Sequence, residues 1–319
     1  MDVFYLGDPS DAELAQLPER FRVTRITRES APDIERAEIL IGALIPRELL
    51  VRAHRLRYVI IPFAGVPSRD RETLSEFPQI TVLNSHFNSR AAAEHAWALL
   101  LSAAKRIVPA SESLRRGDWS PRYREEYSVS LQGKTLLLIG YGAIGHALVP
   151  MARGFRMSVQ AIKRTPGDDP EIDRLGTPEE LARFLPDADA IIVSLPATPQ
   201  TEGMLNAQVF SRMKPGVIFV NVGRGSAVDE DAFYDAMESG RIGAAGIDTW
   251  WKYPTSAEER QQTPPSRNPL DRFPHLVFSP HRASQVRERE RDRFDALAEI
   301  LDSIIAGAPK NIVDRSVWY

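Results

Sequence analysis

Short apolar runs alternate with helix-compatible stretches along the first hundred residues. The apolar runs, at residues 3–6, 39–42, 58–61 and 80–83, have the length and composition of buried strands. Helical patterns lie between them, at residues 13–17 and 46–54. Strands that alternate with helices in this way form a parallel sheet with helical crossovers, so the pattern predicts an α/β domain.

A longer helix is predicted from residue 90 to about residue 107, because apolar residues recur there at helical spacing. Residues 109–134 are richer in charge and in turn formers, and we predict a connector there. Alternation then returns, with strands predicted near residues 135–139, 158–162, 190–195, 217–221, 243–247 and 276–279. This regular pattern predicts a second, doubly wound α/β domain.

Two later segments have different patterns. Residues 250–273 contain four prolines among charged residues, which predicts a long loop, and long loops in compact domains are often functional. Residues 285–306 have an apolar face at helical spacing. We expect this last helix to return to the first domain.

The apolar run before residue 140 ends in three glycines spaced G-x-G-x-x-G, and helix-competent sequence follows. Gly140 allows a tight turn, Gly142 lets backbone approach a pyrophosphate, and Gly145 lets the helix pack closely on the strand. The first amides of the helix would then face the phosphates. We predict a dinucleotide-binding turn; an ordinary strand-turn-helix corner is the alternative. The residues predicted to contact the dinucleotide here are Gly140, Tyr141, Gly142, Ala143, Ile144 and Gly145.

The residues about 20 positions further on indicate which dinucleotide binds. An NAD-binding protein carries an acid there that binds the ribose hydroxyls, whereas this chain has Lys163, Arg164 and Thr165. An acid would repel a 2′-phosphate, but an ammonium, a guanidinium and a hydroxyl can bind one. We therefore predict that NADP(H) is preferred over NAD(H). A solvated charged pair at a strand end is the alternative.

Composition narrows the class of protein. The chain has 319 residues, 43% apolar and 26% charged, which suffices for two domains with cores of their own. A net charge of −3 provides no basic field, so no nucleic-acid partner is expected. No cysteine occurs, which excludes disulfides and thiolate metal sites, and we expect no metal. Because no signal peptide or membrane-length apolar segment is visible, we expect a cytoplasmic protein without membrane contacts.

Several motifs, in this order and spacing, resemble the D-isomer-specific 2-hydroxyacid dehydrogenase family over essentially the whole chain. They are Ala93-Glu94-His95, the glycine turn from Gly140 to Gly145, Leu195-Pro196 with Thr198 and Thr201, Lys214-Pro215-Gly216, Val220 to Gly225, Gly246-Ile247-Asp248 and Ser279-Pro280-His281. The resemblance implies a Rossmann-type cofactor domain, a flavodoxin-like substrate domain, a cleft between them and a homodimer. We assign residues 104–283 to the dinucleotide-binding domain and residues 1–103 with 284–319 to the substrate domain.

Arg224 and His281 are the residues whose chemistry fits a reductase. A guanidinium after an apolar strand can hold a 2-oxoacid carboxylate with two hydrogen bonds. A histidine at the end of the last predicted strand can deliver a proton near neutral pH. The resemblance gives both residues these roles. It also implies dinucleotide contacts from Leu195, Pro196, Thr201, Val222, Gly223, Arg224, Asp248 and His281.

The chain departs from the family at residue 253. The family places a Glu before a proline, five residues after the Asp of the preceding strand, where it orients the catalytic His and raises the pKa of that His. Here Tyr253 precedes Pro254 at that position. A neutral phenol can hydrogen-bond an imidazole but supplies no negative charge to favour imidazolium. We predict Arg224, His281 and Tyr253 as the catalytic set, with Glu94 as the other acid that could serve.

Four residues are predicted to contact the substrate. Ala64 and Gly65 lie where the family presents backbone amides to the substrate carboxylate; an ordinary turn after a strand is the alternative. His86 precedes the long helix at the expected edge of the cleft, and Trp250 lies on the long loop. With Trp251 and Tyr253 nearby, the pocket should be roomy and aromatic.

Two functions remain open at this point. The favoured one is an NADP(H)-dependent oxidoreductase that interconverts a small 2-oxoacid and a D-2-hydroxyacid by hydride transfer. The alternative is a dinucleotide-sensing binding or regulatory protein of the same fold with little turnover. The missing Glu favours the alternative, and the presence of Arg224 and His281 opposes it.

Overall fold

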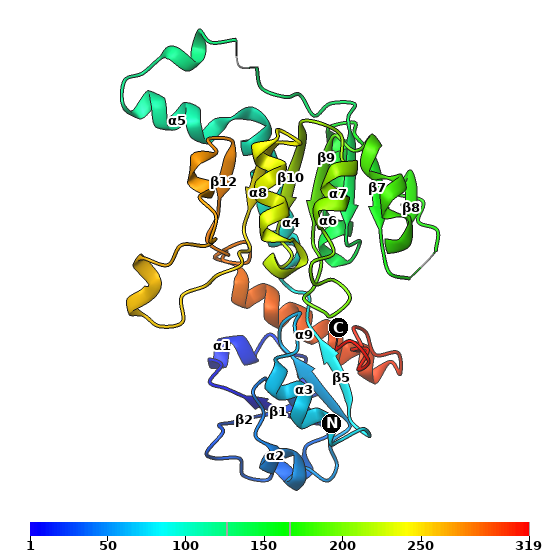
Figure 1. Cartoon of the computed structure of the whole chain (residues 1–319). Helices are drawn as coiled ribbons and strands as arrows, with labels where there is room; N and C mark the ends of the chain where they lie inside the picture. The colour runs from blue at the N-terminus through cyan, green and yellow to red at the C-terminus, as the bar shows by residue number, and fades with distance from the viewer. Residues whose placement is uncertain (126, 166, 319) are drawn as a thin grey trace. The chain divides into compact units, whose positions relative to one another are not determined.

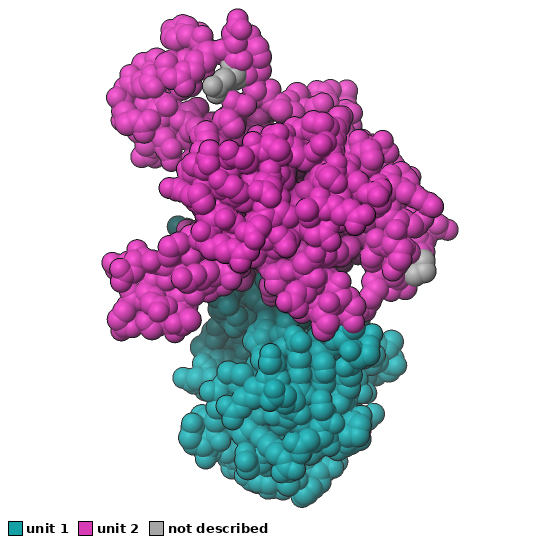
Figure 2. All heavy atoms as spheres, viewed as in Figure 1, with its two compact units in different colours: residues 1–88, 285–319 teal, residues 89–284 magenta. Residues whose placement is uncertain are grey.

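The computed structural model describes residues 1–125, 127–165 and 167–318 of the chain. It divides into unit 1, which comprises Met1–Asn88 and Gln285–Tyr319, and unit 2, which comprises Ser89–Ser284 (Figure 2). The division at residue 88 differs from the predicted boundary at residue 103. The difference is the long helix α4 (Ser89–Lys105), which belongs to unit 2.

Unit 1 contains one five-stranded parallel sheet in the order β2-β1-β3-β4-β5. Figure 1 draws its strands in blue to cyan and labels β1, β2 and β5. The strands are β1 (Asp2–Leu6), β2 (Arg22–Ile26), β3 (Ile39–Ile41), β4 (Tyr58–Ile61) and β5 (Thr81–Asn84). The helices are α1 (Asp11–Leu14), α2 (Arg47–Arg52), α3 (Ser68–Ser75) and α9 (Arg289–Ile305). This strand order is flavodoxin-like, as predicted. The C-terminal helix α9 buries Phe294, Leu297 and Leu301 in the same cluster as Val3 and Tyr5, so its predicted return to the first domain is confirmed.

Unit 2 contains a seven-stranded parallel sheet in the order β12-β11-β10-β9-β6-β7-β8, which confirms the doubly wound Rossmann-type prediction. The strands are β6 (Thr135–Ile139), β7 (Ser158–Ile162), β8 (Arg174–Gly176), β9 (Ala190–Val193), β10 (Val217–Asn221), β11 (Ile242–Ile247) and β12 (Leu276–Phe278). Besides α4, the helices are α5 (Ile107–Arg115), α6 (Ala143–Gly154), α7 (Ala207–Arg212) and α8 (Glu230–Glu238).

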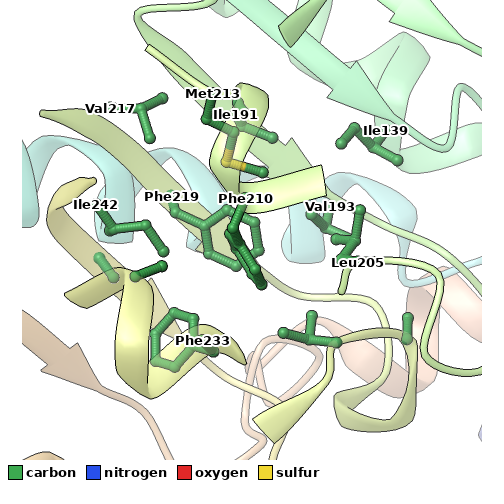
Figure 3. Packing of buried hydrophobic residues seen from close by; sticks show 14 of the residues in the cluster. Ile139, Ile191, Val193, Leu205, Phe210, Met213, Val217, Phe219, Phe233 and Ile242 are labelled. Atoms are coloured by element: carbon green, nitrogen blue, oxygen red, sulfur yellow. The ribbon is translucent and has the colours of Figure 1, made fainter. Parts of the chain in front are cut away.

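Both faces of the unit 2 sheet are covered by buried side chains. On one face the rings of Phe210, Phe219 and Phe233 pack together, with centroids 5.7 to 6.3 Å apart (Figure 3). On the other face α4 packs against β10, β11 and α6. A Cβ at Gly246 would lie 2.8 Å from the Cβ of Leu99, so the glycine in β11 lets α4 approach the strand closely. This close packing explains why α4 belongs to unit 2.

Three short elements were not predicted. Strand β2 carries two arginines and buries only Ile26, and β8 has three residues, so neither presents a buried apolar run. Helix α5 lies at the start of the predicted connector and buries none of its residues. In the segment from α5 onward, Leu114, Trp119, Tyr123 and Tyr127 are all exposed. Among the described residues, no helix is long and apolar enough to cross a membrane.

Candidate active site

The predicted site residues of unit 2 follow the carboxyl ends of its strands. The glycine turn follows β6, residues 194–196 follow β9, and residues 222–224 follow β10. Residues 248–250 and 279–281 follow β11 and β12. Because all the paired strands are parallel, these segments meet at one edge of the sheet, where open α/β sheets bind their ligands.

The glycine turn after β6 has the geometry that an anion-binding helix start requires. Gly140 has φ +95°, which favours glycine, and a Cβ at Gly145 would lie 2.9 Å from the Tyr141 ring. By contrast, a Cβ at Gly142 would meet nothing within 4 Å. Helix α6 starts at Ala143, and no side chain caps it. The turn therefore leaves open space in front of uncapped helix amides, which fits the phosphates of a dinucleotide.

The residues after β7 combine cations with one acid, Asp169, that no sequence motif indicated. Arg164 and Thr165 are exposed and Lys163 is half-buried. The hydroxyl of Tyr141 donates to Asp169 at 3.0 Å, which connects the glycine turn to this loop. The pKa of Asp169 is lowered mainly by the backbone N–H of Glu171, and Lys163 adds to the effect. The candidate 2′-phosphate site thus holds a carboxylate close to its lysine.

The turn that carries Arg224 packs closely against two neighbouring loops. A Cβ at Gly223 would lie 2.6 Å from the backbone of Leu195, and one at Gly225 would lie 2.2 Å from the carbonyl oxygen of Trp250. Asn221 is buried, accepts from the N–H of Gly223 at 3.0 Å, and donates to the Arg224 carbonyl at 3.1 Å. These contacts fix the backbone of Arg224, whose side chain is exposed at the sheet edge.

The residues after β9 that are predicted to contact the dinucleotide lie in one loop, which an internal hydrogen bond closes. The hydroxyl of Thr201 donates to the carbonyl of Pro196 at 2.6 Å. Leu195 is largely buried, and its backbone contacts the Arg224 turn through Gly223. The loop therefore lies between the glycine turn and the Arg224 turn, as a dinucleotide contact requires.

His281 lies in a tight turn that a buried carboxylate holds. Its backbone has φ +54°, a left-handed conformation that non-glycine residues adopt uncommonly. Asp248, fully buried, accepts hydrogen bonds from the N–H of Arg282 at 2.9 Å, the N–H of Ala283 at 3.1 Å and the hydroxyl of Ser279. Asp248 therefore uses both carboxylate oxygens within the protein.

His95 on α4 joins this network. Its Nε2 lies 2.8 Å from the Ser279 hydroxyl. Because that hydroxyl donates its proton to Asp248, His95 must donate through Nε2. The same Nε2 lies 3.4 Å from Asp248 Oδ1. Burial alone would raise the pKa of Asp248, but the interactions with His95 and then with the Ser279 hydroxyl lower it to about 2. Glu94, the other acid considered from the sequence, is exposed on α4.

Tyr253 contacts His281 directly. Its hydroxyl oxygen lies 2.9 Å from His281 Nδ1 and 3.1 Å from the backbone nitrogen of Trp250. The Trp250 indole N–H donates to the Ser279 carbonyl at 2.8 Å, and its ring stacks on Phe278 at 5.0 Å. Trp250 therefore supports both Tyr253 and the turn that carries His281.

The electrostatic surroundings disfavour imidazolium at His281. Partial burial lowers the pKa of His281, Arg224 lowers it further, and Asp248 opposes the shift. Partial burial raises the pKa of Tyr253, whereas the Trp250 N–H and Arg224 oppose that shift. Both groups are therefore neutral near pH 7.

Arg224, Trp250, Tyr253 and His281 line one cavity of about 470 Å³ together with Gly225, Ser226 and Trp251. The cavity lining contains three aromatic side chains and one permanent cation, and no carboxylate among the described residues. Such a surface suits an anionic substrate that also presents an apolar part. Among the described residues, no group of three His, Cys, Asp or Glu could hold a metal ion.

The other predicted substrate residues belong to unit 1. Ala64 and Gly65 follow β4 and His86 follows β5, so they lie at the carboxyl ends of adjacent strands. The side-chain amide of Asn84 donates to the Ala64 carbonyl at 2.6 Å, which joins the two loops. Burial lowers the pKa of His86. The structure thus brings these three residues to one edge of the unit 1 sheet.

A family model described as "D-isomer specific 2-hydroxyacid dehydrogenase, NAD binding domain" matches residues 97–283. The chain is 29% identical to the glyoxylate/hydroxypyruvate reductase B of Yersinia enterocolitica, over 99% of this chain and 96% of that protein. It is also 29% identical to the D-3-phosphoglycerate dehydrogenase of Methanocaldococcus jannaschii, over 91% of this chain. The match spans about half, 54%, of that relative's length.

A solved structure is similar over almost the whole chain. It is an acyclic imino acid reductase in complex with NADPH and D-Arg, with a TM-score of 0.74 and 25% identity. The similarity covers 98% of this chain and 100% of that one.

Proposed function

The chain belongs to the D-isomer-specific 2-hydroxyacid dehydrogenase family, and we propose that it reduces a small 2-oxoacid to the D-2-hydroxyacid with NADPH. The observation that carries this proposal is the cavity that Arg224, Tyr253 and His281 share at the carboxyl edge of a Rossmann-type sheet. A guanidinium and a proton-carrying dyad are the groups that a 2-oxoacid reduction needs.

Each of the three residues has one task in this proposal. When bound, a reduced nicotinamide supplies a hydride for the substrate carbonyl carbon. Arg224 binds the substrate carboxylate and polarises the carbonyl; in this structure one guanidinium N–H donates to the Gly223 carbonyl at 2.7 Å. Nε2 of His281 donates to the carbonyl oxygen, and Tyr253 holds the ring through Nδ1 at 2.9 Å.

The proposed cofactor is NADPH in preference to NADH. Lys163, Arg164 and Thr165 at the end of β7 support the preference, because they can bind a 2′-phosphate. The NADPH complex of the similar imino acid reductase is consistent with it. The open space at Gly142 and the uncapped start of α6 support binding of the pyrophosphate.

The proposed substrate contacts include Ala64, Gly65 and His86 in unit 1, and Trp250 in unit 2. The aromatic lining supports a 2-oxoacid with an apolar side chain rather than glyoxylate alone. Trp250 is only 6% exposed and its indole N–H is already bonded, so its side chain offers the substrate a small apolar surface and no hydrogen bond.

A turnover assay tests the function directly. The purified chain is mixed with NADPH and a panel of 2-oxoacids that includes glyoxylate, hydroxypyruvate and phenylpyruvate, and the loss of NADPH absorbance and the chirality of the product are measured. We expect reduction of at least one 2-oxoacid to its D-isomer. Tight NADPH binding with no turnover would instead support the dinucleotide-sensing alternative, which the enzyme relatives do not favour.

Reduction of an imino acid is a second candidate. The observation that favours it is the absence of a carboxylate from the described lining of the cavity, because a protonated imine brings its own proton and needs no imidazolium. The assay therefore includes each 2-oxoacid with and without ammonia. A D-amino acid product in the ammonia arm would support this candidate.

We also propose that the chain forms a homodimer, as the family resemblance implies. Ile107, Leu114, Trp119, Tyr123 and Tyr127 are between 49% and 78% exposed on one segment of unit 2. Exposed apolar side chains in this number commonly mark a protein interface. Light scattering of the purified chain should give twice the mass of 35.7 kDa, and Trp119→Ser with Tyr123→Ser should reduce it.

A further inference from the structure

The protein groups around the Tyr253 oxygen favour one direction for its hydrogen bond with His281. The Trp250 backbone N–H, 3.1 Å from the Tyr253 oxygen, can only donate. Among the described residues, His281 Nδ1 at 2.9 Å is the acceptor available to the hydroxyl proton. We assign the hydroxyl proton to Nδ1, which makes His281 a neutral ring with its proton on Nε2.

The groups that face His281 are consistent with a neutral ring. They are Arg224 after β10, Asp248 after β11 and Tyr253 on the long loop. Asp248 is the one carboxylate among them, and it is buried and occupied by the N–H groups of the turn. A neutral imidazole cannot release its Nε2 proton to a substrate unless Nδ1 gains a proton at the same time.

We propose that Tyr253 is the source of the proton for reduction and passes it through His281. This inference rests on the proposed 2-oxoacid reduction. The carbonyl carbon gains the hydride of the reduced dinucleotide, which is oxidised, and the electron pair of the C=O π bond moves to oxygen. That oxygen takes the Nε2 proton of His281, and Nδ1 takes the hydroxyl proton of Tyr253. The phenolate that remains regains a proton from water.

The relay is chemically feasible because the substrate oxygen becomes the strongest base in it. The alkoxide of an alcohol is a much stronger base than the phenolate of tyrosine, whose phenol has a pKa of about 10. Partial burial raises the pKa of Tyr253 and so disfavours the phenolate, while the Trp250 N–H and the positive charge of Arg224 stabilise it. Tyr253 is 42% exposed, so water can return the proton. Tyr253 thus acts through His281 as a positioning and proton-supplying residue.

The pH dependence of reduction distinguishes this relay from proton donation by imidazolium. If the relay operates, kcat/KM stays high through the pH range in which an imidazolium would be lost, and falls only when the Tyr253 phenol ionises. In Tyr253→Phe only imidazolium can donate. We expect its kcat to fall by about 10²-fold at pH 8, the low end of what a positioned proton donor contributes, with little change in KM.

Two further variants separate the hydroxyl's chemistry from packing. Tyr253→Glu supplies a carboxylate that favours imidazolium, so it should recover activity near pH 6 to 7 and lose it again at higher pH than Tyr253→Phe. Tyr234→Phe is the matched control, because its hydroxyl bonds Arg272 on a different surface. A wild-type profile that already falls below pH 7, or a Tyr253→Phe profile equal to the wild type, would overturn the relay.

Nitrogen NMR of labelled histidine tests the hydrogen-bond direction without turnover. The chain has six histidines, and the His281 signal is assigned as the one that is absent from the spectrum of His281→Gln. At pH 7 it should show a neutral ring protonated on Nε2, and Tyr253→Phe should change that signal. If no 2-oxoacid is reduced, the proposed function fails and this measurement still decides the geometry: a His281 protonated on Nδ1 contradicts the relay.

Discussion

His95 and Ser279 share a hydrogen bond of 2.8 Å although they are 184 positions apart in the chain. The bond links helix α4 to the end of β12, and through the Ser279 hydroxyl it reaches the buried carboxylate of Asp248. Asp248 in turn holds the N–H groups of residues 282 and 283. The turn that holds His281 in its left-handed conformation is therefore part of a hydrogen-bond network that begins at helix α4.

Replacement of Asp248 by Asn should destabilise the protein in a pH-dependent way. The pKa of Asp248 is lowered from 3.8 to about 2, a difference worth about 2 kcal/mol of folding free energy. Because the folded-state pKa is the lower one, this contribution is complete above about pH 4 and is lost as the pH falls towards 2. The free energy of unfolding, measured by urea titration, should therefore differ most between wild type and variant at neutral pH.

Asp235→Asn removes the same charge from an exposed position on α8 and provides the control. It should leave the free energy of unfolding within about 0.5 kcal/mol of wild type. An Asp248→Asn variant as stable as this control at pH 7 would contradict the role given to the network.

Replacement of His281 by Ala should affect turnover far more than dinucleotide binding. The ring is the group in the cavity that can donate to a substrate oxygen through Nε2, and a positioned donor is worth roughly 10²–10⁴ in kcat. The exposed His54 of unit 1 offers a control in His54→Ala. Steady-state kinetics and NADPH fluorescence titration measure the two quantities. Near-normal turnover in the His281 variant would place the proton donor elsewhere.

The parts of the fold that repeat regularly could be predicted from the sequence. The family and both parallel sheets are confirmed, because buried parallel strands appear as apolar runs and the glycine turn has a fixed spacing. The predicted unit boundary at residue 103 differs from the division at residue 88, because the packing of α4 depends on Gly246, a contact between distant positions. A contact between distant positions leaves no pattern in the local sequence from which the unit boundary could be predicted.

The candidate site shows the same limit. Arg224, Tyr253 and His281 could be named from motif positions, and the structure brings them to one cavity. The roles of Asn221, His95 and Ser279 could not be predicted, since each acts through a hydrogen bond to a residue on another element or turn. A polar residue inside an apolar run, such as Asn221 at the end of β10, was the available signal.

Gly142→Ala should preserve the fold and weaken dinucleotide binding. An alanine Cβ at this position meets no protein atom within 4 Å, so the free energy of unfolding should hardly change. The same Cβ would occupy the space in front of α6, and a steric conflict of about 1–3 kcal/mol corresponds to about 5- to 150-fold weaker NADPH binding. Gly154→Ala, equally open and at the other end of α6, should bind NADPH normally. Equal NADPH affinities in the two variants would show that the phosphates do not bind at this turn.

The cofactor preference should depend on the balance of charge after β7. One or two cations on a 2′-phosphate should favour NADPH over NADH by about 100-fold in kcat/KM, equivalent to about 2.7 kcal/mol. Lys163→Ala should reduce that ratio, and Lys310→Ala, an exposed position of unit 1, should leave it unchanged. Asp169→Asn should raise the ratio, because it removes a negative charge that interacts with Lys163 while the amide oxygen can still accept from Tyr141.

We expect opposite effects because Lys163 and Asp169 carry opposite charges, and each acts on the 2′-phosphate electrostatically. The ratios should therefore converge as salt is added, since exposed charges are screened over about 8 Å at physiological ionic strength. Steady-state kinetics with both reduced cofactors at low and high salt measure this. A wild-type ratio of one, or a preference for NADH, would contradict the NADPH assignment, and an unchanged ratio in Asp169→Asn would show that its carboxylate acts only on Tyr141.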